Sequence, residues 1–295
     1  MGWREVLEVQ TALVGSLRGF LVSRGFLELM PVVVAPATDP LWPDSASSPR
    51  PVSFEYAGGR LFLTQSMILH KLAAVGQGLD KVFAFSPNVR LESAERAATG
   101  RHLLEFVQLD FEVAGAKMDD IMALVEEMVA RAVEGVRRMA SEALGRLGAW
   151  PEVPRRPFER MTLEEVRAEF GEVWEEEASR AMDEPFWVTD IPREFYDLEE
   201  PPGHFRNYDL IWPRGHGEAL SGGEREWRPW RIEERLNGVA REVVGPFLEL
   251  ARSGLLRPSA GAGLGIERFL KFLLDADRVE DVRLFARVPG RVPPL

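Results

Sequence analysis

Two stretches in the first half of the chain alternate between apolar and polar residues with a period of two. Residues 81–92 put two phenylalanines on one side and Asn88 and Arg90 on the other. Residues 104–113 carry Val107, Leu109, Phe111 and Val113 on one side and Phe106, Gln108, Asp110 and Glu112 on the other. This period predicts antiparallel strands that bury one face. The opposite faces gather charges and amides beside an aromatic ring, so they form either a solvated surface or the floor of a site.

Apolar residues at helical spacing predict long helices at residues 3–24 and 118–147. Another helix begins near Thr64 or Ser66, either of which suits an N-cap. Further strands are expected at residues 26–34, 52–56, 60–63, 185–190, 207–212 and 217–227, and shorter helices at about 230–241 and 245–253. Because the strands mostly follow one another and helices are appended, we predict an α+β fold with an antiparallel sheet flanked by helices.

Two segments interrupt this order of elements. Residues 150–183 are highly charged and weakly periodic, and we interpret them as a small helical insertion within a single domain that covers residues 1–295. Residues 35–51 are rich in proline and serine. Loops of this length are mobile linkers or lids over a site, and the presence of Asp39, Trp42 and Asp44 favours a lid.

Glycines mark two places near the C-terminal end where backbones approach closely. The run at residues 261–265 is a weak match to a dinucleotide-binding fingerprint, because no βαβ unit surrounds it. A strand that leads into a helix is the better interpretation, and it places Arg268 one turn into that helix. Glu218 and Arg225 lie seven positions apart in one predicted strand, so a bulge at residues 221–223 is needed to bring both to one face.

Composition narrows the chemistry of the chain. The net charge of −11, from 47 acidic and 36 basic residues, disfavours non-specific binding to nucleic acid or anionic membranes. No cysteine is present, which excludes disulfides and thiol catalysis, and the four histidines are not in zinc-binding spacing. A hard, oxygen-ligated cation is therefore the expected metal. The chain lacks a long uncharged apolar run and a signal peptide, so we expect a soluble, cytoplasmic protein without a membrane partner.

Four segments together resemble the catalytic core of class II aminoacyl-tRNA synthetases, and most closely the aspartyl/asparaginyl branch. Residues 88–92 and 100–112 resemble motif 2, residues 261–268 motif 3, and residues 25–31 a degenerate motif 1, while residues 218–225 resemble the glycine-rich substrate strand. The resemblance runs from about residue 10 to the end of the chain. It implies an adenylate-forming core that uses ATP and Mg²⁺, and motif 1 implies a homodimer.

Other features resemble a subgroup of this branch, the archaeal-type asparagine synthetases. Residues 38–44, 70–71, 222–227 and 258–261 carry that likeness, and the chain begins at the first helix of the core, without the anticodon-binding barrel of the branch. Two positions depart from the tRNA-charging enzymes: Ile68 stands where they have glutamine, and Ser259 where they have histidine. Both border the amino-acid pocket, so an altered substrate pose is plausible.

The resemblance assigns a role to each candidate residue. Arg90 would hold the α-phosphate of ATP, Phe106 and Arg268 would stack on the two faces of adenine, and Glu92, His102, Glu218 and Gly265 would complete ATP binding. Arg90, Arg268 and Glu218 would act in catalysis, and Asp209 and Glu218 would bind Mg²⁺. Aspartate would be held by Lys71, Arg225, Asp110, Gln108, Ser66, Asp39 and Gly222. The alternative interpretation of His102 is an exposed loop histidine, which we consider the less favoured of the two.

The sequence therefore predicts an AMP-forming asparagine synthetase, an aspartate–ammonia ligase that works through β-aspartyl-adenylate. Lys71 and Arg225 are two cations that suit a dianionic substrate, and the asparaginyl enzymes have an acid where Lys71 stands. Aspartate, ATP and ammonia are the expected partners, and tRNA is not. Two alternatives stay open: an aspartyl-tRNA synthetase-like enzyme that charges tRNA, and a non-catalytic paralogue that binds aspartate or an adenylate.

Overall fold

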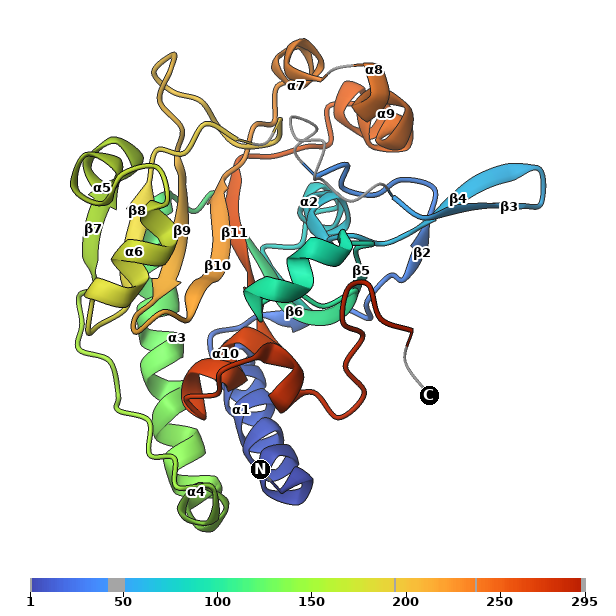
Figure 1. Cartoon of the computed structure of the whole chain (residues 1–295). Helices are drawn as coiled ribbons and strands as arrows, with labels where there is room; N and C mark the ends of the chain where they lie inside the picture. The colour runs from blue at the N-terminus through green and yellow to red at the C-terminus, as the bar shows by residue number, and fades with distance from the viewer. Residues whose placement is uncertain (1, 42–50, 194, 237, 293–295) are drawn as a thin grey trace.

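The computed structural model describes residues 2–41, 51–193, 195–236 and 238–292, and its centre is an eight-stranded sheet (Figure 1). The strand order is β1-β5-β6-β11-β10-β9-β8-β7. The outermost pairs, β1 with β5 and β7 with β8, are parallel, and the five inner pairs are antiparallel. The strands are β1 (Leu27–Glu28), β5 (Lys81–Val89), β6 (Glu105–Ala114), β7 (Glu159–Thr162), β8 (Phe186–Thr189), β9 (Asn207–Trp212), β10 (Gly217–Glu224) and β11 (Ser259–Gly265).

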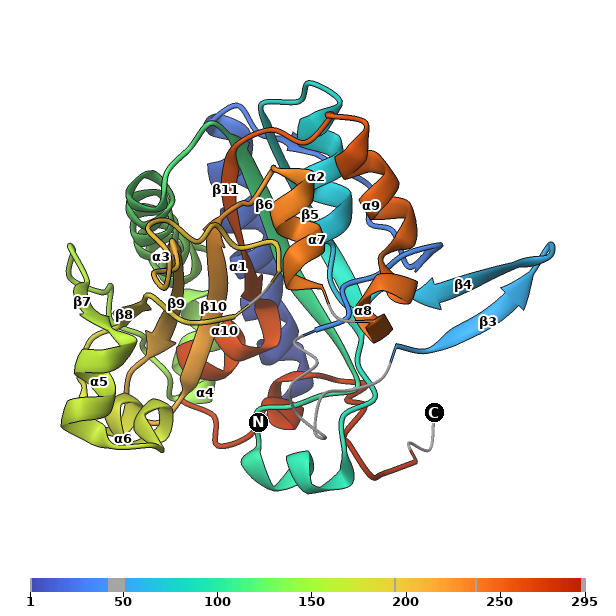
Figure 2. The same ribbon diagram turned by 90° about the horizontal axis from the view of Figure 1, so that it is seen from above.

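Helices cover one face of the sheet and bury the main core (Figure 2). These helices are α1 (Trp3–Ser23), α3 (Met118–Met139), α4 (Ser141–Leu147) and α10 (Ile266–Leu273). Phe83, Leu109 and Phe111, from the apolar sides of β5 and β6, lie in this core. Helix α1 has the length and hydropathy of a membrane span, but its apolar stripe is fully buried in the same cluster, as in the core helix of a globular domain.

The other face of the sheet carries two separate groups of helices. Near β5 and β6 lie α2 (Ile68–Gly76), α7 (Pro229–Arg235), α8 (Gly238–Val243) and α9 (Gly245–Arg252), and near β8 and β9 lie α5 (Leu163–Phe170) and α6 (Trp174–Ala181). A second, three-stranded sheet has the order β2-β4-β3, with β2 (Val34–Ala35), β3 (Ser53–Tyr56) and β4 (Gly59–Leu63). There are also two 3₁₀ helices, η1 (Ala94–Thr99) and η2 (Val279–Val282), and η2 contacts α10.

The predicted α+β fold and the alternation on β5 and β6 are confirmed, and several local expectations need correction. The long helix expected at 118–147 breaks at Ala140, whose φ of −119° and ψ of 27° are not helical. The run at 26–34 forms only two short strands, on either side of Pro31. Residues 150–183 contain α5 and α6 but also β7, which joins the main sheet, so the segment is not purely helical.

Three smaller corrections concern bulges, caps and helix ends. The register of β10 against β9 shifts between Glu218 and Leu220, so the bulge comes earlier than residues 221–223. Met67 precedes α2, while the Ser66 hydroxyl accepts a hydrogen bond from the Ile68 amide at 3.2 Å. The helix expected at 230–241 is divided into α7 and α8. Most of the candidate lid, including Trp42 and Asp44, lies outside the described residues.

Gly261 on β11 lies so close to β6 that it limits the spacing of these two strands. A Cβ at this position would lie 2.2 Å from the Phe111 carbonyl oxygen and 2.8 Å from the Glu112 Cα. Backbone atoms of a central strand cannot move aside without shifting the strand itself. The absence of a side chain at Gly261 therefore sets where Glu112 is held.

We expect Gly261→Ala to lower the free energy of unfolding by about 1–3 kcal/mol, the usual cost of overpacking a core. Gly145→Ala is the matched control, because Gly145 lies within α4 with no atom near its missing Cβ. There the helix propensity of alanine should raise stability by up to about 1 kcal/mol. Urea unfolding curves measure both values, and equal stability of the two variants would contradict the close approach.

Candidate active site

Two adjoining cavities lie on the polar side of β5 and β6. The larger has a volume of about 290 Å³ and the smaller one of about 230 Å³. Arg90, Gln108, Glu218 and Gly263 line both. Because the two cavities share these walls, a molecule in one can contact a molecule in the other. The polar face of β5 and β6 is therefore the floor of a site and not a solvated surface.

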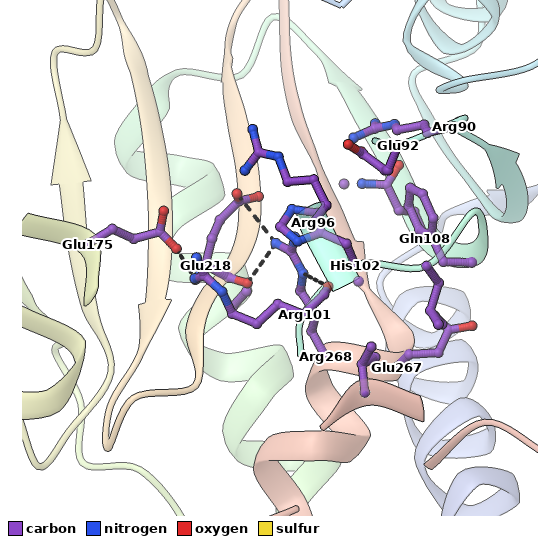
Figure 3. A pocket seen from close by; sticks show the side chains of 16 residues that line it. Arg90, Glu92, Arg96, Arg101, His102, Gln108, Glu175, Glu218, Glu267 and Arg268 are labelled. Atoms are coloured by element: carbon purple, nitrogen blue, oxygen red, sulfur yellow. Dashed lines mark hydrogen bonds and ion pairs between the residues drawn. The ribbon is translucent and has the colours of Figure 1, made fainter. Parts of the chain in front are cut away.

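The larger cavity collects the residues assigned to ATP. Seven of these, namely Arg90, Glu92, His102, Phe106, Glu218, Gly265 and Arg268, line it together with Gln108. The strand β11 leads directly into α10, and Arg268 projects from the first turn of that helix back over β10 (Figure 3). Its guanidinium donates to the Glu218 carbonyl oxygen at 3.0 Å and lies 3.4 Å from the Glu218 carboxylate. The prediction that Arg268 lies in the first turn of a helix after the glycine run is confirmed.

Arg90 lies at the boundary between the two cavities, where phosphate chemistry would need a cation. Its Nε donates to the Gln65 carbonyl oxygen at 3.1 Å, which fixes the side chain. The guanidinium carbon lies 5.1 Å from the centroid of the Phe106 ring, within cation–π range. Glu92 lines the same cavity, and burial raises the pKa of its carboxyl despite the nearby charges of Arg90 and two further arginines.

His102 lies in an environment that disfavours its charged form. Its Nδ1 is 2.7 Å from the Thr99 hydroxyl. Burial, followed by the charges of Arg268, Arg96 and Arg101, lowers the pKa of His102 to about 3. The ring is therefore neutral at physiological pH. It can offer a hydrogen bond to a phosphate without an added positive charge, and it is not an exposed loop histidine.

The insertion at 150–183 contributes directly to the larger cavity. Glu175 from α6 forms a close ion pair with Arg101 and accepts a hydrogen bond from the Glu218 amide at 3.1 Å (Figure 3). Arg101 also contributes to the pKa of Glu218: burial alone would raise it, but four guanidinium groups, from Arg268, Arg193, Arg101 and Arg90, lower it. The cluster keeps Glu218 ionised. Glu218 is thus an anion that is surrounded by cations.

Asp209 and Glu218 are the acids that were assigned to a metal ion. Asp209 is buried and accepts from Arg193 at 2.7 Å, and it is not among the side chains that line either cavity. Burial and the charge of Glu218 raise its pKa to about 6, although Arg193 opposes this. No group of three or more His, Asp or Glu side chains within the described part of the chain could hold a metal. Two repelling carboxylates suit a Mg²⁺ ion that takes its other ligands from phosphates and water.

The smaller cavity contains the residues assigned to aspartate. Lys71, Arg225, Asp110, Gln108, Ser66, Asp39 and Gly222 all line it. The amine of Lys71, on α2, lies 3.2 Å from Asp110 and 3.6 Å from Glu112, and it donates to the Ala262 carbonyl oxygen at 2.9 Å. Lys71 is thus buried, with carboxylates on two sides.

Arg225 follows β10 and donates several hydrogen bonds at this cavity. Its guanidinium donates to Glu112 at 3.1 Å, to Asp197 at 3.1 Å and to the Gly261 carbonyl oxygen at 2.8 Å. Burial alone would lower the pKa of Arg225, but Glu112 and Asp197 more than offset this and raise it. The sequence interpretation placed two cations and Asp110 in this cavity, and the structure adds the carboxylates of Glu112 and Asp197 beside them.

Asp39, Ser66 and Gly222 border the rest of the smaller cavity. Asp39 accepts from the Tyr196 hydroxyl at 3.0 Å, and burial raises its pKa. A Cβ on Gly222 would lie 2.5 Å from the Gly261 carbonyl oxygen, so β10 and β11 leave no room for a side chain there. The Ser259 hydroxyl, at the start of β11, donates to Glu112 at 2.9 Å.

Several side chains of the site gave no recognisable signal in the sequence. Arg96, Arg101, Glu175, Arg193, Tyr196 and Asp197 line the two cavities. Glu175 lies in a run of glutamates that is typical of a solvated helix, and Asp197 lies in an irregular loop. Glu112 did stand on the polar side of a predicted strand. Its alternation with Gln108 and Asp110 was the signal that could have identified it.

The family model of class II tRNA synthetases (D, K and N) matches residues 2–289. The aspartate–tRNA(Asp/Asn) ligase of Methanopyrus kandleri is 30% identical over an alignment of 311 positions, gaps included. The alignment covers 98% of this chain and 69% of that protein. The asparagine–tRNA ligase of Thermococcus gammatolerans is 29% identical over 313 residues, with coverage of 98% and 70%.

Solved structures agree with these sequence matches. The asparaginyl-tRNA synthetase from Pyrococcus horikoshii, complexed with asparaginyl-adenylate, superposes with a TM-score of 0.84 at 26% identity, and the alignment covers 99% of this chain and 70% of that one. The match extends over the central sheet and over the segments that line both cavities. From the family model, the relatives and the fold together, the chain belongs to the class II tRNA synthetases of the aspartyl, lysyl and asparaginyl group.

Proposed function

We propose that this protein activates aspartate with ATP and transfers the activated acyl group to ammonia, giving asparagine, AMP and pyrophosphate. The observation that carries the proposal is the pair of adjoining cavities with Arg90 at their boundary. One cavity has arginines and an aromatic ring suited to a nucleotide. The other has Lys71 and Arg225 suited to the carboxylate of a small amino acid.

The first half-reaction joins the two bound substrates. A carboxylate oxygen of aspartate forms a bond to the α-phosphorus of ATP, and the bond from that phosphorus to pyrophosphate breaks. Arg90 lines both cavities, so it would lie where negative charge increases on the phosphoryl oxygens, and a fixed cation there stabilises the transition state. Arg268 and the neutral His102 would hold the remaining phosphates. The side chains of this site bind and position the substrates and form no covalent intermediate.

Mg²⁺ would be held by Asp209 and Glu218, and it would neutralise charge on the phosphates. Arg193, which contacts Asp209, would move or share that carboxylate when the ion binds. The other residues of the cavity keep their roles with or without this ion: Glu175 and Arg101 fix the position of Glu218.

In the second half-reaction, ammonia is the acceptor that we favour. Its lone pair forms a bond to the acyl carbon, AMP leaves with the electrons of the acyl–oxygen bond, and the new amide loses a proton. The net charge of −11 does not favour binding of a polyanion such as tRNA. Ser259 and Ile68, which depart from the tRNA-charging pattern, both lie near the amino-acid cavity: Ile68 lines it, and Ser259 bonds to Glu112 beneath it.

Transfer of the aspartyl group to tRNA is the second candidate. The names of the relatives favour it, since the Methanopyrus kandleri protein is an aspartate–tRNA ligase and the Thermococcus gammatolerans protein an asparagine–tRNA ligase. The two candidates share the adenylation step. They differ in the acceptor and in the carboxylate that is activated, which is the β-carboxylate for asparagine and the α-carboxylate for tRNA.

The acceptor can be identified by product analysis. With aspartate, Mg·ATP and an ammonium salt in the absence of tRNA, we expect asparagine and AMP in equal amounts, measured by chromatography and mass spectrometry. A parallel reaction contains tRNA and no ammonium. Aspartyl-tRNA in that reaction, without asparagine in the first, would replace the main proposal by the second candidate. Lack of turnover in both would favour a non-catalytic binding protein.

The metal site should depend on pH through Asp209. Its pKa of about 6 lies above the ordinary value, so the protonated form persists to higher pH and competes with the ion below that value. We expect the affinity for Mg²⁺, measured by calorimetry, to increase by roughly tenfold per pH unit up to about pH 6 and then to level off. Asp209→Asn should bind weakly with no such rise. The same pH dependence in wild type and variant would exclude Asp209 as a ligand.

We also propose that the protein is a homodimer. Exposed apolar side chains gather on the segment after α1 and on the small sheet that it enters: Leu27, Met30, Val33, Val34, Phe54 and Tyr56. Several large exposed apolar side chains on one segment and on the sheet that it enters are typical of an interface. The second copy would cover this patch.

Replacing Met30, which is 87% exposed, and Tyr56 by lysine should therefore shift the protein from dimer to monomer in analytical ultracentrifugation. Met139→Lys is the matched control, because Met139 is also exposed but lies at the end of α3, away from this patch. If the double variant and the wild type both sedimented as dimers, the interface would lie elsewhere.

A further inference from the structure

Asp197 is a buried carboxylate at the inner end of the smaller cavity. Its side chain is 1% exposed and accepts from Arg225 at 3.1 Å and from the Asn207 amide at 2.9 Å. The backbone holds it there, because the segment around Asp197 pairs with the end of β10. The Leu198 amide donates to the Glu224 carbonyl oxygen and the Glu226 amide to the Tyr196 carbonyl oxygen, both at 2.9 Å.

The charges at this inner end do not balance. We call the five side chains there, Lys71, Asp110, Glu112, Asp197 and Arg225, the inner-end cluster. Two are cations and three are carboxylates, so the cluster carries one net negative charge when all are ionised. Arg193 lies 3.7 Å from Asp197 and 2.7 Å from Asp209, so adding Arg193 and Asp209 to the count adds one charge of each sign and leaves the net value unchanged.

One acceptor of the inner-end cluster has no hydrogen-bond partner. The Oδ2 atom of Asp110 is buried without a donor, while its Oδ1 contacts Lys71 at 3.2 Å. Asp110 also lines the smaller cavity. A buried carboxylate oxygen without a partner at a cavity wall is stabilised when a ligand donates a hydrogen bond to it, and a positively charged donor gives the strongest bond.

Aspartate can enter this cavity in two orientations. If its α-carboxylate faces ATP, the β-carboxylate meets the inner-end cluster and adds another negative charge to it. If its β-carboxylate faces ATP, the α-ammonium and α-carboxylate both meet the cluster and together add no net charge. A cluster that is already negative favours the second orientation, because like charges repel strongly when they are removed from water.

We propose that Asp197 is a positioning residue that selects this second orientation. Asp197 offsets part of the charge of Arg225, so that the inner-end cluster accepts the α-ammonium at Asp110 and the α-carboxylate at Lys71 and Arg225. The β-carboxylate then points to ATP and forms the bond to the α-phosphorus, and pyrophosphate leaves. This inference rests on the proposed function and deepens it, since β-adenylation is what makes asparagine the product with ammonia.

The test is the position of the acyl group that the enzyme transfers. Hydroxylamine captures the adenylate, releasing AMP, and gives β-aspartyl hydroxamate from the β-adenylate or α-aspartyl hydroxamate from the α-adenylate. We expect wild type to give the β-product. Asp197→Asn keeps the size of the side chain and removes its charge. It should lower the ratio of β- to α-product by at least about tenfold, with little change in the KM for ATP.

Asp190→Asn is the matched control. Asp190 is a carboxylate of the same loop, but it bonds to His204 and to the Phe205 amide and lines neither cavity. Its product ratio should equal that of wild type. An unchanged ratio in Asp197→Asn would overturn the role of Asp197 and leave asparagine synthesis standing. If wild type gave the α-product and no β-product, the proposed function itself would be overturned.

A measurement on wild type keeps the test valid if Asp197→Asn fails to fold. Asparagine retains the α-ammonium and α-carboxylate, whereas isoasparagine, the α-amide, retains only the α-ammonium and the β-carboxylate. We expect asparagine to compete with aspartate in the hydroxamate assay at least about tenfold better than isoasparagine. Stronger competition by isoasparagine would overturn the orientation.

Discussion

Arg225 can be buried in the centre of this protein because its guanidinium donates hydrogen bonds to two carboxylates and to a backbone carbonyl oxygen. A buried cation without such partners is strongly destabilising, and removal of one partner leaves an uncompensated charge. Glu112 comes from β6, Asp197 from the loop before β9, and the Gly261 carbonyl oxygen from β11. These segments are far apart in the sequence, and their positions depend on one guanidinium group. Gly222 and Gly261 allow the strands to approach closely enough for these contacts.

The same requirement for paired charges accounts for the rest of the site. Glu218 is held among arginines from the residue after β5, the segment after η1, the loop before β9 and α10, and its bulged strand turns it toward both cavities. Arg90 marks the boundary, with cations on the nucleotide side and a mixed cluster on the amino-acid side. The chemistry that follows is adenylation, which requires two substrates in contact and a fixed cation at the phosphorus. Such a site needs no nucleophilic side chain.

The sequence predicted the parts of this site that have a signal within a few neighbouring residues, and it missed those that depend on contacts between distant segments. The strands β5 and β6 were predicted because alternation is local, and the motif likeness identified Arg90, Phe106 and Arg268 together. The balancing acids could not be found in this way. Asp197 lies in an irregular loop, and Glu175 lies on a helix that looks solvated; both acquire a role only when distant strands come together. The bulge was predicted at residues 221–223 because of the glycines there, but it lies at Glu218–Leu220. The glycines at 222 and 223 allow close packing against distant segments, which the sequence does not show.

Exchange of pyrophosphate into ATP tests the central claim, which is that the two cavities form an aspartyl adenylate. The assay needs only the protein, Mg·ATP, labelled pyrophosphate and one amino acid, so it does not depend on the acceptor. The account predicts exchange that requires aspartate and is much weaker with asparagine, since asparagine has no β-carboxylate to form the bond to the α-phosphorus. Exchange that asparagine supports better than aspartate, or no exchange with either, would contradict it.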